Sequence, residues 1–216
     1  MRHGFDLICA ATGLLVLSPL FALIALAVKL NGGGGPVFYL QPRVGKNGRE
    51  FYLIKFRTMV SDADRYGLLT VPEDRRVTFV GRFLRKHKLD ELPQLINVLK
   101  GDMRLVGPRP EMKRYVDMFR SEYKVLLKDP PGITDPASLA YRHEEKMLKA
   151  ECLEEHYVSQ ILPHKLRLSL EYSHRRTFFS DLKIVLQTLV GANVAECESS
   201  STSASQQSSN AVSSKK

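Results

Sequence analysis

The stretch Leu7–Val28, LICAATGLLVLSPLFALIALAV, decides the architecture of this chain, because about 22 consecutive residues carry no charge. At about 1.5 Å of rise per residue, the run would form a helix of roughly 33 Å, which is close to the thickness of a bilayer. We therefore expect a membrane segment here, and the rest of the chain to be attached to a membrane through it.

Pro19 stands near the middle of this run and limits how it can sit in a bilayer. Proline donates no backbone hydrogen bond, so the carbonyl of Leu15 loses its partner, although the Ser18 hydroxyl can bond a carbonyl one turn back. If the chain turns at Ser18-Pro19, each arm of about 11 residues returns to the side it entered. The break favours this re-entrant arrangement over a kinked spanning helix, and over a signal peptide cleaved near Ala25–Ala27, whose apolar core is usually shorter.

The remaining composition is that of an ordinary globular domain. Of 216 residues, 44% are hydrophobic and 25% are charged, which excludes a collagen-like or wholly disordered chain. The three cysteines, Cys9, Cys152 and Cys197, are too few and too far apart for a disulfide framework or a zinc knuckle, which favours a reducing compartment. A glycine-rich connector at 31–35 and a serine-rich, disordered tail divide the chain into a membrane helix (1–30), a domain (31–190) and a tail (191–216).

The chain is basic, with 32 Lys and Arg against 23 Asp and Glu and a net charge of +9. Such an excess favours a polyanion, an anionic lipid surface or a phosphorylated substrate, and charge alone does not choose among them. Five basic residues follow the apolar run closely, which by the positive-inside tendency places this side in the cytoplasm. A solvated edge would carry the same residues, which are Arg43, Lys46, Arg49, Lys55 and Arg57.

Local patterns predict an α+β fold for the domain. Two aromatic and β-branched runs around Lys46–Arg49, which contains Asn-Gly, indicate a β-hairpin, and 77–86 indicates a basic helix with apolar residues at helical spacing. Further amphipathic helices are expected over 111–127, with a core-facing stripe, and in the acidic stretch 144–155, whose carboxylates should mostly be solvated. The apolar stretch 178–191 indicates a last helix that starts at a Ser180 or Asp181 cap and packs in the core, or alternatively lies on a membrane.

Residues 88–102, KLDELPQLINVLKGD, predict a helix that buries Leu92, Leu95, Ile96 and Leu99 and ends at Lys100-Gly101. Asp90 and Glu91 stand at its start, where an N-cap and a first-turn acid are ordinary. With Asp90 as the cap, however, position N3 is Pro93, which has no N–H to donate. Residue chemistry alone therefore favours capping and leaves a functional carboxylate pair as the alternative.

The following loop, GDMRLVGPRP, holds Arg109 between prolines that stiffen the backbone. A fixed guanidinium offers a planar fork of donors that suits bidentate phosphate recognition. An exposed arginine in a tight turn is equally compatible with the local sequence.

The run RFLRKHKLDELPQLINVLKGDMRLVGPRP (82–110), followed by PGIT and preceded by KFRTM and the Ser-Pro of the apolar run, resembles the bacterial sugar transferase family. These are monotopic polyprenyl-phosphate phosphoglycosyl transferases, and the resemblance extends to about residue 190. It implies transfer of a phosphosugar from a nucleotide diphosphate sugar, usually a UDP-sugar, to polyprenyl phosphate, with release of UMP and with Mg²⁺ as cofactor. It also implies a re-entrant helix broken at Ser18-Pro19, on the cytoplasmic face of the bacterial inner membrane, and a step that initiates glycan assembly.

The resemblance also assigns roles to residues. Asp90 matches the nucleophile that forms a phosphosugar-aspartate intermediate, and Glu91 matches its partner, so that the two carboxylates are the expected Mg²⁺ ligands. Such an attack is chemically reasonable if cations first neutralise the phosphate. Phosphate or nucleotide contacts match Arg85, Arg109 and Arg142, although the motif around Arg142 departs from the common Gly-Trp-Ala-Gln form. Glu154 stands where relatives often have aspartate, which implies an accessory acidic role.

Two other classes of protein fit the composition. A membrane-tethered nucleic-acid-binding protein would use the positive charge, but the sequence shows no recognisable binding motif and no aromatic residues interleaved with the basic ones. A non-catalytic membrane scaffold would not depend on Asp90. The expected partners are therefore a nucleotide sugar, polyprenyl phosphate and membrane lipids, with a homodimer as one option and no nucleic acid.

Overall fold

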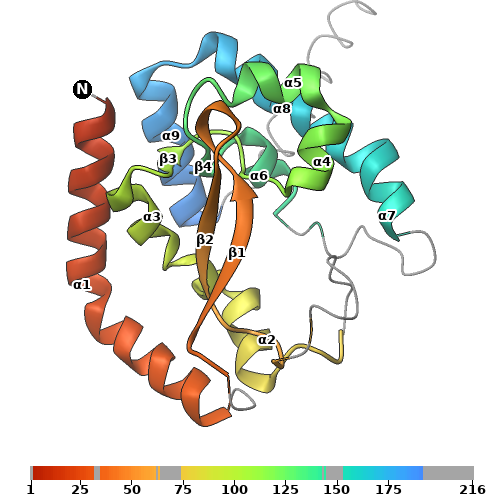
Figure 1. Cartoon of the computed structure of the whole chain (residues 1–216). Helices are drawn as coiled ribbons and strands as arrows, with labels where there is room; N and C mark the ends of the chain where they lie inside the picture. The colour runs from red at the N-terminus through yellow and green to blue at the C-terminus, as the bar shows by residue number, and fades with distance from the viewer. Residues whose placement is uncertain are drawn as a thin grey trace, which may run out of the picture.

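A computed structural model describes residues 2–31, 35–61, 63, 74–142, 144 and 153–191 of the chain. Most of the predicted glycine-rich connector, most of the predicted acidic helix and the serine-rich tail lie outside the described residues. Within them, one long N-terminal helix runs along a small mixed α/β domain (Figure 1), which agrees with the predicted fold class.

Helix α1 (Arg2–Asn31) contains the predicted apolar segment and is long and apolar enough to cross a membrane. It stays helical through Pro19, and Figure 1 shows it bent along its length rather than straight. The Ser18 hydroxyl donates to the carbonyl of Leu15 at 2.8 Å, as predicted. This bond supplies the partner that Pro19 withholds from that carbonyl.

Both halves of α1 pack against the domain. In the first half, Ala10 is fully buried beside Leu53, and in the second half Ile24 lies against Phe56. The opposite face of α1 is apolar and exposed, with Ile8, Leu15, Val16, Leu23, Leu26 and Leu30 on it. The inner face of α1 is therefore part of the core of the fold.

The predicted hairpin is confirmed as β1 (Phe38–Val44) paired antiparallel with β2 (Glu50–Phe56). The connection contains the short 3₁₀ turn η1 (Lys46–Gly48), in which Asn47 and Gly48 have φ angles of 56° and 77°. Asparagine and glycine tolerate this left-handed region better than other residues. Asn-Gly therefore predicted the hairpin correctly, because the turn requires two residues with positive φ angles.

Helix α2 (Phe79–Lys86) also forms where predicted, after Thr78, whose hydroxyl accepts a hydrogen bond from the Gly81 amide at 2.9 Å. Of its apolar residues, Leu84 is buried, whereas Phe79 and Phe83 are exposed. Figure 1 places α2 beside the open end of the hairpin, away from η1.

The helix predicted to start at Asp90 is divided into a 3₁₀ turn, η3 (Leu89–Glu91), and α3 (Gln94–Lys100), which ends as predicted at Gly101 with φ 82°. The predicted buried stripe is confirmed only in part: Leu92 and Leu95 are partly buried against core clusters, whereas Leu99 is exposed and α3 fully buries Gln94, Asn97 and Val98. The Asn97 amide pairs with the backbone of β2, accepting from the Ile54 N–H at 3.0 Å and donating to the Tyr52 carbonyl at 2.8 Å. The face of α3 that lies against the unpaired edge of β2 is therefore polar, because Asn97 supplies hydrogen bonds to the backbone of that strand.

The helix predicted over 111–127 is likewise two helices, α4 (Lys113–Met118) and α5 (Arg120–Leu126), separated at Phe119. Its predicted core stripe is confirmed, since Tyr115, Tyr123 and Leu126 are buried in one cluster with Leu166. The remaining elements are β3 (Arg104–Val106), β4 (Gly132–Thr134), α6 (Pro136–Ala140), α7 (Leu153–His156), the π-helical turn η6 (Tyr157–Ile161), α8 (Leu162–Arg175) and α9 (Phe178–Val190).

Strands β3 and β4 pair in parallel. The backbone at Gly107, directly after β3, comes very close to Gly132, the first residue of β4. A Cβ atom on Gly132 would lie 2.1 Å from the Gly107 nitrogen, so only glycine fits at this position. The Gly132 amide donates to the Pro108 carbonyl at 2.9 Å. This contact fixes the start of the loop that carries Arg109.

Helix α9 begins at a Thr177 cap, with a reciprocal bond to Ser180, and not at Ser180 or Asp181 as predicted. The expectation of core packing is confirmed for one face only, where Ile184 is buried in a cluster with Val106. Its other face exposes Phe179, Leu186, Leu189 and Val190.

Candidate active site

Asp90 is a buried carboxylate that does not cap a helix. The turn η3 follows Lys88, which adopts a left-handed conformation with φ 57°, and no side chain caps η3 or α3. Asp90 is 8% exposed as a residue, and its side-chain Oδ1 atom has no hydrogen-bond partner among the described residues. The capping interpretation is therefore wrong, because Pro93 stands where the helix would present its donors.

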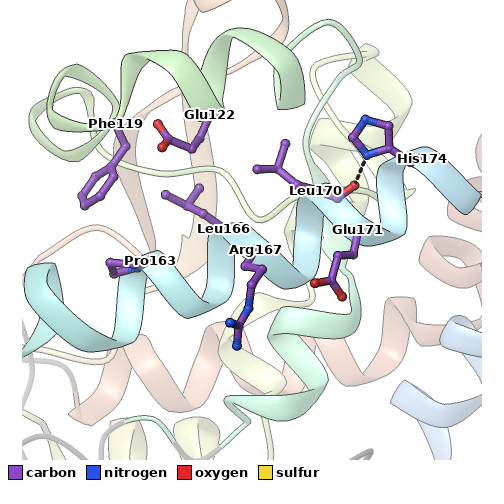
Figure 2. Close-up of a pocket in the computed structure, with 8 residues that line it drawn as sticks. All are labelled: Phe119, Glu122, Pro163, Leu166, Arg167, Leu170, Glu171 and His174. Atoms are coloured by element: carbon purple, nitrogen blue, oxygen red, sulfur yellow. Dashed lines mark hydrogen bonds between the residues drawn. The ribbon is translucent and has the colours of Figure 1, made fainter.

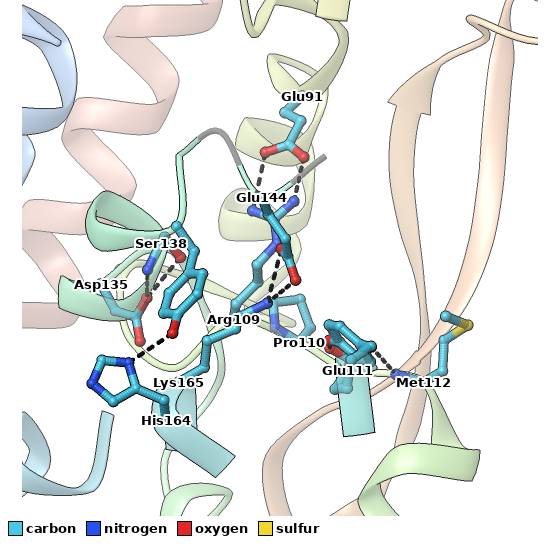
Figure 3. A network of polar contacts seen from close by, with 12 residues as sticks. Glu91, Arg109, Pro110, Glu111, Met112, Asp135, Ser138, Glu144, His164 and Lys165 are labelled. Atoms are coloured by element: carbon cyan, nitrogen blue, oxygen red, sulfur yellow. Dashed lines mark hydrogen bonds and ion pairs between the residues drawn. The ribbon is translucent and has the colours of Figure 1, made fainter. Parts of the chain in front are cut away.

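Glu91, next to it, is held by two cations. Arg109 grips it with both guanidinium nitrogens, Nη2 on Oε1 and Nη1 on Oε2 at 3.2 Å (Figure 3). Lys55 approaches Oε1 from β2 with its Nζ atom at 3.4 Å. The structure thus brings together two of the predicted residues, Glu91 and Arg109, and adds a third that was not predicted.

The two adjacent carboxyl groups have pKa values shifted in opposite directions. Burial raises the pKa of Asp90 and the charge of Glu91 adds to this, against Lys55 and Arg85. Burial would also raise the pKa of Glu91, but the charges of Arg109 and Lys55 outweigh it and hold that pKa well below its usual range. Neighbouring titratable groups whose environments separate their pKa values are typical of sites that do chemistry.

Arg85 reaches this site from α2. Its Nε atom donates to the Thr58 hydroxyl at 2.9 Å, and its charge acts on the pKa of Asp90. The α2 helix can approach only because residue 81 is glycine, since a Cβ atom there would lie 2.0 Å from the Thr58 carbonyl oxygen. Thr58 itself is buried and accepts from the Thr78 amide at 2.9 Å, so it fixes both α2 and Arg85.

Two predicted residues lie elsewhere. Arg142 Nη1 is 3.4 Å from the Thr188 carbonyl oxygen near the end of α9, and Glu154 pairs with Arg114 at 2.6 Å on a half-exposed surface. Neither has a hydrogen bond or ion pair with Asp90 or Glu91 in the part of the chain that the structure describes. Ser18 and Pro19, the predicted membrane break, lie inside α1, which stays helical through both residues.

A second group of charges lies behind Arg109. The Nζ atom of Lys165, which is buried, is 3.1 Å from both carboxylate oxygens of Glu144, so this glutamate is not simply solvated as the sequence suggested. Figure 3 shows this pair beside Arg109, and the charge of Glu144 helps Glu91 to raise the pKa of Arg109. Glu91 therefore bonds the guanidinium directly, whereas Glu144 acts on it through its charge.

The site described above is a group of charged side chains. A groove of about 330 Å³ lies between α5 and α8 (Figure 2) and contains none of the predicted site residues. It is lined by Phe119, Glu122, Pro163, Leu166, Arg167, Leu170, Glu171 and His174.

Sequence reasoning missed Lys55 and Thr58 as site residues. The sequence pattern places Lys55 among the basic residues that follow the apolar run, which indicate either the cytoplasmic side of a membrane or a solvated edge of the hairpin. Its position inside the otherwise apolar strand FYLIKF was the available signal, because a lysine is rarely placed in such a strand without a partner. Thr58 carries no comparable local signal.

The donor set fits a divalent cation only in part. Asp90 Oδ1 is an orphaned buried oxygen of the kind that a hard cation binds, whereas both oxygens of Glu91 are already paired. Among the described residues, no group of three or more His, Cys, Asp and Glu side chains gathers at one place. Mg²⁺ typically takes one or two carboxylates and completes its shell with phosphate and water oxygens, which this site allows.

Comparisons with known proteins identify relatives of the chain. A family model described as bacterial sugar transferase matches residues 1–194. The chain is 41% identical over 147 residues to the UDP-N-acetylgalactosamine-undecaprenyl-phosphate N-acetylgalactosaminephosphotransferase of Aeromonas hydrophila, covering 65% of this chain and 34% of that protein. It is 38% identical over 196 residues to the uncharacterized sugar transferase EpsL of Bacillus subtilis, covering 91% and 89%.

A further relative is the UDP-glucose:undecaprenyl-phosphate glucose-1-phosphate transferase of Escherichia coli, 37% identical over 194 residues, which cover 88% of this chain and 39% of that protein. The chain thus spans most of EpsL and little more than a third of the two longer transferases. The family model covers α1, the hairpin and the residues from Asp90 to Arg109. The chain belongs to the bacterial sugar transferase family.

Proposed function

We propose that this chain transfers a phosphosugar from a UDP-sugar to a polyprenyl phosphate, with release of UMP, at the cytoplasmic face of the bacterial inner membrane. The single observation that carries the proposal is the buried, unpartnered Asp90 oxygen beside a glutamate held by Arg109 and Lys55. The names of the relatives, which specify undecaprenyl phosphate and in two cases a UDP-sugar, support these substrates. The product would be the first lipid-linked unit of a glycan.

Asp90 acts as the nucleophile in this proposal. Its carboxylate oxygen attacks the sugar-bearing phosphorus, a new O–P bond forms, and the bond between that phosphorus and the UMP oxygen breaks. The oxygen of polyprenyl phosphate then attacks the same phosphorus and releases the Asp90 carboxylate. Burial favours this role, because a poorly solvated carboxylate with a raised pKa is a better nucleophile than a hydrated one.

The cations around Asp90 allow two anions to meet. A carboxylate and a diphosphate repel each other unless fixed positive charges neutralise the phosphate oxygens. Arg109 offers a bidentate fork, and Arg85 and Lys55 add charge from α2 and β2. Arg109 holds Glu91 in the structure, so a phosphate would compete for donors that are already oriented.

Mg²⁺ is the expected cofactor, with Asp90 and Glu91 as its protein ligands, and when bound it supplies further neutralisation of the diphosphate. Glu91 Oε1 already accepts from Lys55 and Arg109, whereas Oε2 accepts from Arg109 alone and keeps a lone pair that could bind the cation.

We further propose that α1 is re-entrant, with both ends in the cytoplasm. Ala10 in the first half and Ile24 in the second half both pack against the same domain, which a straight spanning helix would not allow. Cysteines introduced near residues 3 and 35, in a chain without other accessible cysteines, should both resist an impermeant thiol reagent in intact cells. Labelling of the N-terminal site from outside would contradict the arrangement.

The covalent step is tested without lipid. Enzyme with UDP-sugar and Mg²⁺ should release about one UMP per active site, and the peptide that contains Asp90 should gain the mass of a phosphosugar. Asp90→Asn should show neither, whereas the matched variant Asp117→Asn, in an exposed ion pair, should behave as wild type. UDP-sugars offered one at a time with undecaprenyl phosphate would identify the donor.

The kinetic pattern provides a second criterion. With both substrates varied, a covalent intermediate predicts parallel lines in a double-reciprocal plot. UMP release that strictly requires lipid, with intersecting lines and an unmodified Asp90 peptide, would leave Asp90 as a metal ligand and not a nucleophile.

A further inference from the structure

Glu111 is a buried carboxylate that the proposed reaction does not use. Its Oε1 atom accepts from Arg43 Nη1 at 2.6 Å and from the Met112 amide at 2.9 Å, and its Oε2 atom accepts from the Tyr157 hydroxyl at 2.8 Å. Its backbone carbonyl accepts from the Val44 amide at 3.0 Å. One residue therefore joins β1, the Arg109 loop and η6.

These bonds lie at the base of the loop that presents Arg109. Only Pro110 separates the two residues, and its carbonyl oxygen accepts from the same Arg43 nitrogen at 3.2 Å. Pro110 and Glu111 are both buried, so the surrounding residues restrict the position of this segment. The other end of the loop is fixed by the contact between Gly107 and Gly132.

The surroundings of Glu111 keep it charged. Burial acts to raise its pKa, but the positive charges of Arg43 and Lys165 and the bonds from Met112 and Tyr157 outweigh burial, so that the pKa lies below its usual value. Tyr157 is itself packed against Tyr115, with ring centroids 5.1 Å apart. The Glu111 carboxylate therefore accepts hydrogen bonds from three donors, Arg43, Met112 and Tyr157, that belong to packed parts of the fold.

We propose that Glu111 is a positioning residue for Arg109: it clamps the backbone after the arginine to β1 and to η6, and so fixes where the guanidinium meets phosphate. Glu111 itself has no described contact with Asp90 or Glu91 and would not touch substrate. The proposal rests on the function proposed above, because it assumes that Arg109 acts on substrate phosphate. A misplacement of about 1 Å in such a group costs up to about a hundredfold in rate.

The test uses the full-length chain in detergent or nanodiscs and follows sugar transfer. Glu111→Gln should lower kcat by about tenfold to a hundredfold, with a smaller change in KM for the UDP-sugar. Because this change leaves the largely buried Arg43 side chain beside a neutral partner and threatens folding, Tyr157→Phe serves as a milder second variant. It removes one of the three bonds and should cost on the order of two- to tenfold in kcat.

A double-mutant comparison separates positioning from simple stability. In an Arg109→Lys background, where the fork is already lost, Glu111→Gln and Tyr157→Phe should each cost less than about twofold in kcat. Ser169→Ala is the matched control, because it also removes a single buried bond from a hydroxyl to a carboxylate, that of Asp135, between α8 and the start of α6. It should lower the melting temperature without lowering kcat per folded enzyme.

The outcomes discriminate. If Glu111→Gln and Tyr157→Phe cost as much with Arg109→Lys as with wild type, or only lower the melting temperature, Glu111 is structural and the positioning role is wrong. If the wild-type enzyme shows no transfer, or Arg109→Lys leaves its rate unchanged, the function proposed for the site fails first. The positioning role is therefore tested by the Glu111 and Tyr157 variants, and the proposed function by the wild-type enzyme and Arg109→Lys.

Discussion

Replacing Asp90 by Asn should make the protein more stable while abolishing sugar transfer. The Asp90 Oδ1 atom is buried without a partner, and burial followed by the charge of Glu91 raises the pKa of this carboxyl. A buried polar group without a hydrogen bond costs about 1–3 kcal/mol, and a neutral amide costs less to bury than a carboxylate. A gain of about 1 kcal/mol corresponds to a rise of about 2–4 °C in melting temperature for a chain of this size.

The pH dependence has a definite sign. Because the folded-state pKa of Asp90 is raised, the protonated carboxyl favours the folded state, and this contribution is lost as the pH rises through that pKa. The melting temperature of Asp90→Asn should therefore exceed that of the wild type most at neutral pH, and the two should converge at acidic pH.

The assay is thermal unfolding followed by far-UV circular dichroism, since the chain contains no tryptophan, with EDTA present to remove divalent cations. Asp135→Ala is the matched control, because Asp135 is a buried carboxylate that caps α6 and accepts from Ser138 and Ser169. That variant should lose about 0.5–2 kcal/mol. A comparable loss for Asp90→Asn at neutral pH would refute the reasoning and make Asp90 structural.

Three further predictions follow from individual contacts. Arg109→Lys should cost about tenfold to a hundredfold in sugar transfer, from the loss of a bond to a charged group, with little change in melting temperature; a large fall in melting temperature would make Arg109 structural. Gly132→Ala should destabilise the fold by about 1–3 kcal/mol in thermal unfolding, because its Cβ would lie 2.1 Å from the Gly107 nitrogen, and an unchanged melting temperature would contradict this close approach. Pro19→Ala restores an N–H donor to Leu15, so α1 should straighten, thiol labelling near residue 3 should appear outside the cell and activity should fall; unchanged labelling and activity would show that the bend does not depend on Pro19.

Local signals predicted several elements correctly, because the physics behind them acts over a few residues. The uncharged run became α1, Asn47-Gly48 made the hairpin turn, and Gly101 ended α3 in the left-handed conformation. Ser18 bonded the carbonyl that Pro19 leaves without a partner. Each of these features depends on residues that are close in sequence, so the tertiary structure could change it little.

The resemblance carried by residues 82–110 identified the family, and with it Asp90, Glu91 and Arg109 as candidate site residues. The sequence itself could not show what each of them contacts. It also missed the burial of Asn97 in α3 and predicted burial for Leu99, which is exposed, because the pairing of Asn97 with the β2 edge is visible only once the hairpin is in place.

The site itself was decided by tertiary structure. Lys55 and Glu91 are 36 residues apart and Arg109 and Glu91 are 18 apart, and they meet only because β2, η3 and the loop after β3 converge. Whether Asp90 caps a helix or remains an unpartnered acceptor depends on how that convergence buries it beside Pro93. Residue type and spacing determined which chemical groups this chain carries, whereas burial and long-range pairing determined the direction in which their pKa values shift, because these shifts depend on neighbours that only the fold supplies.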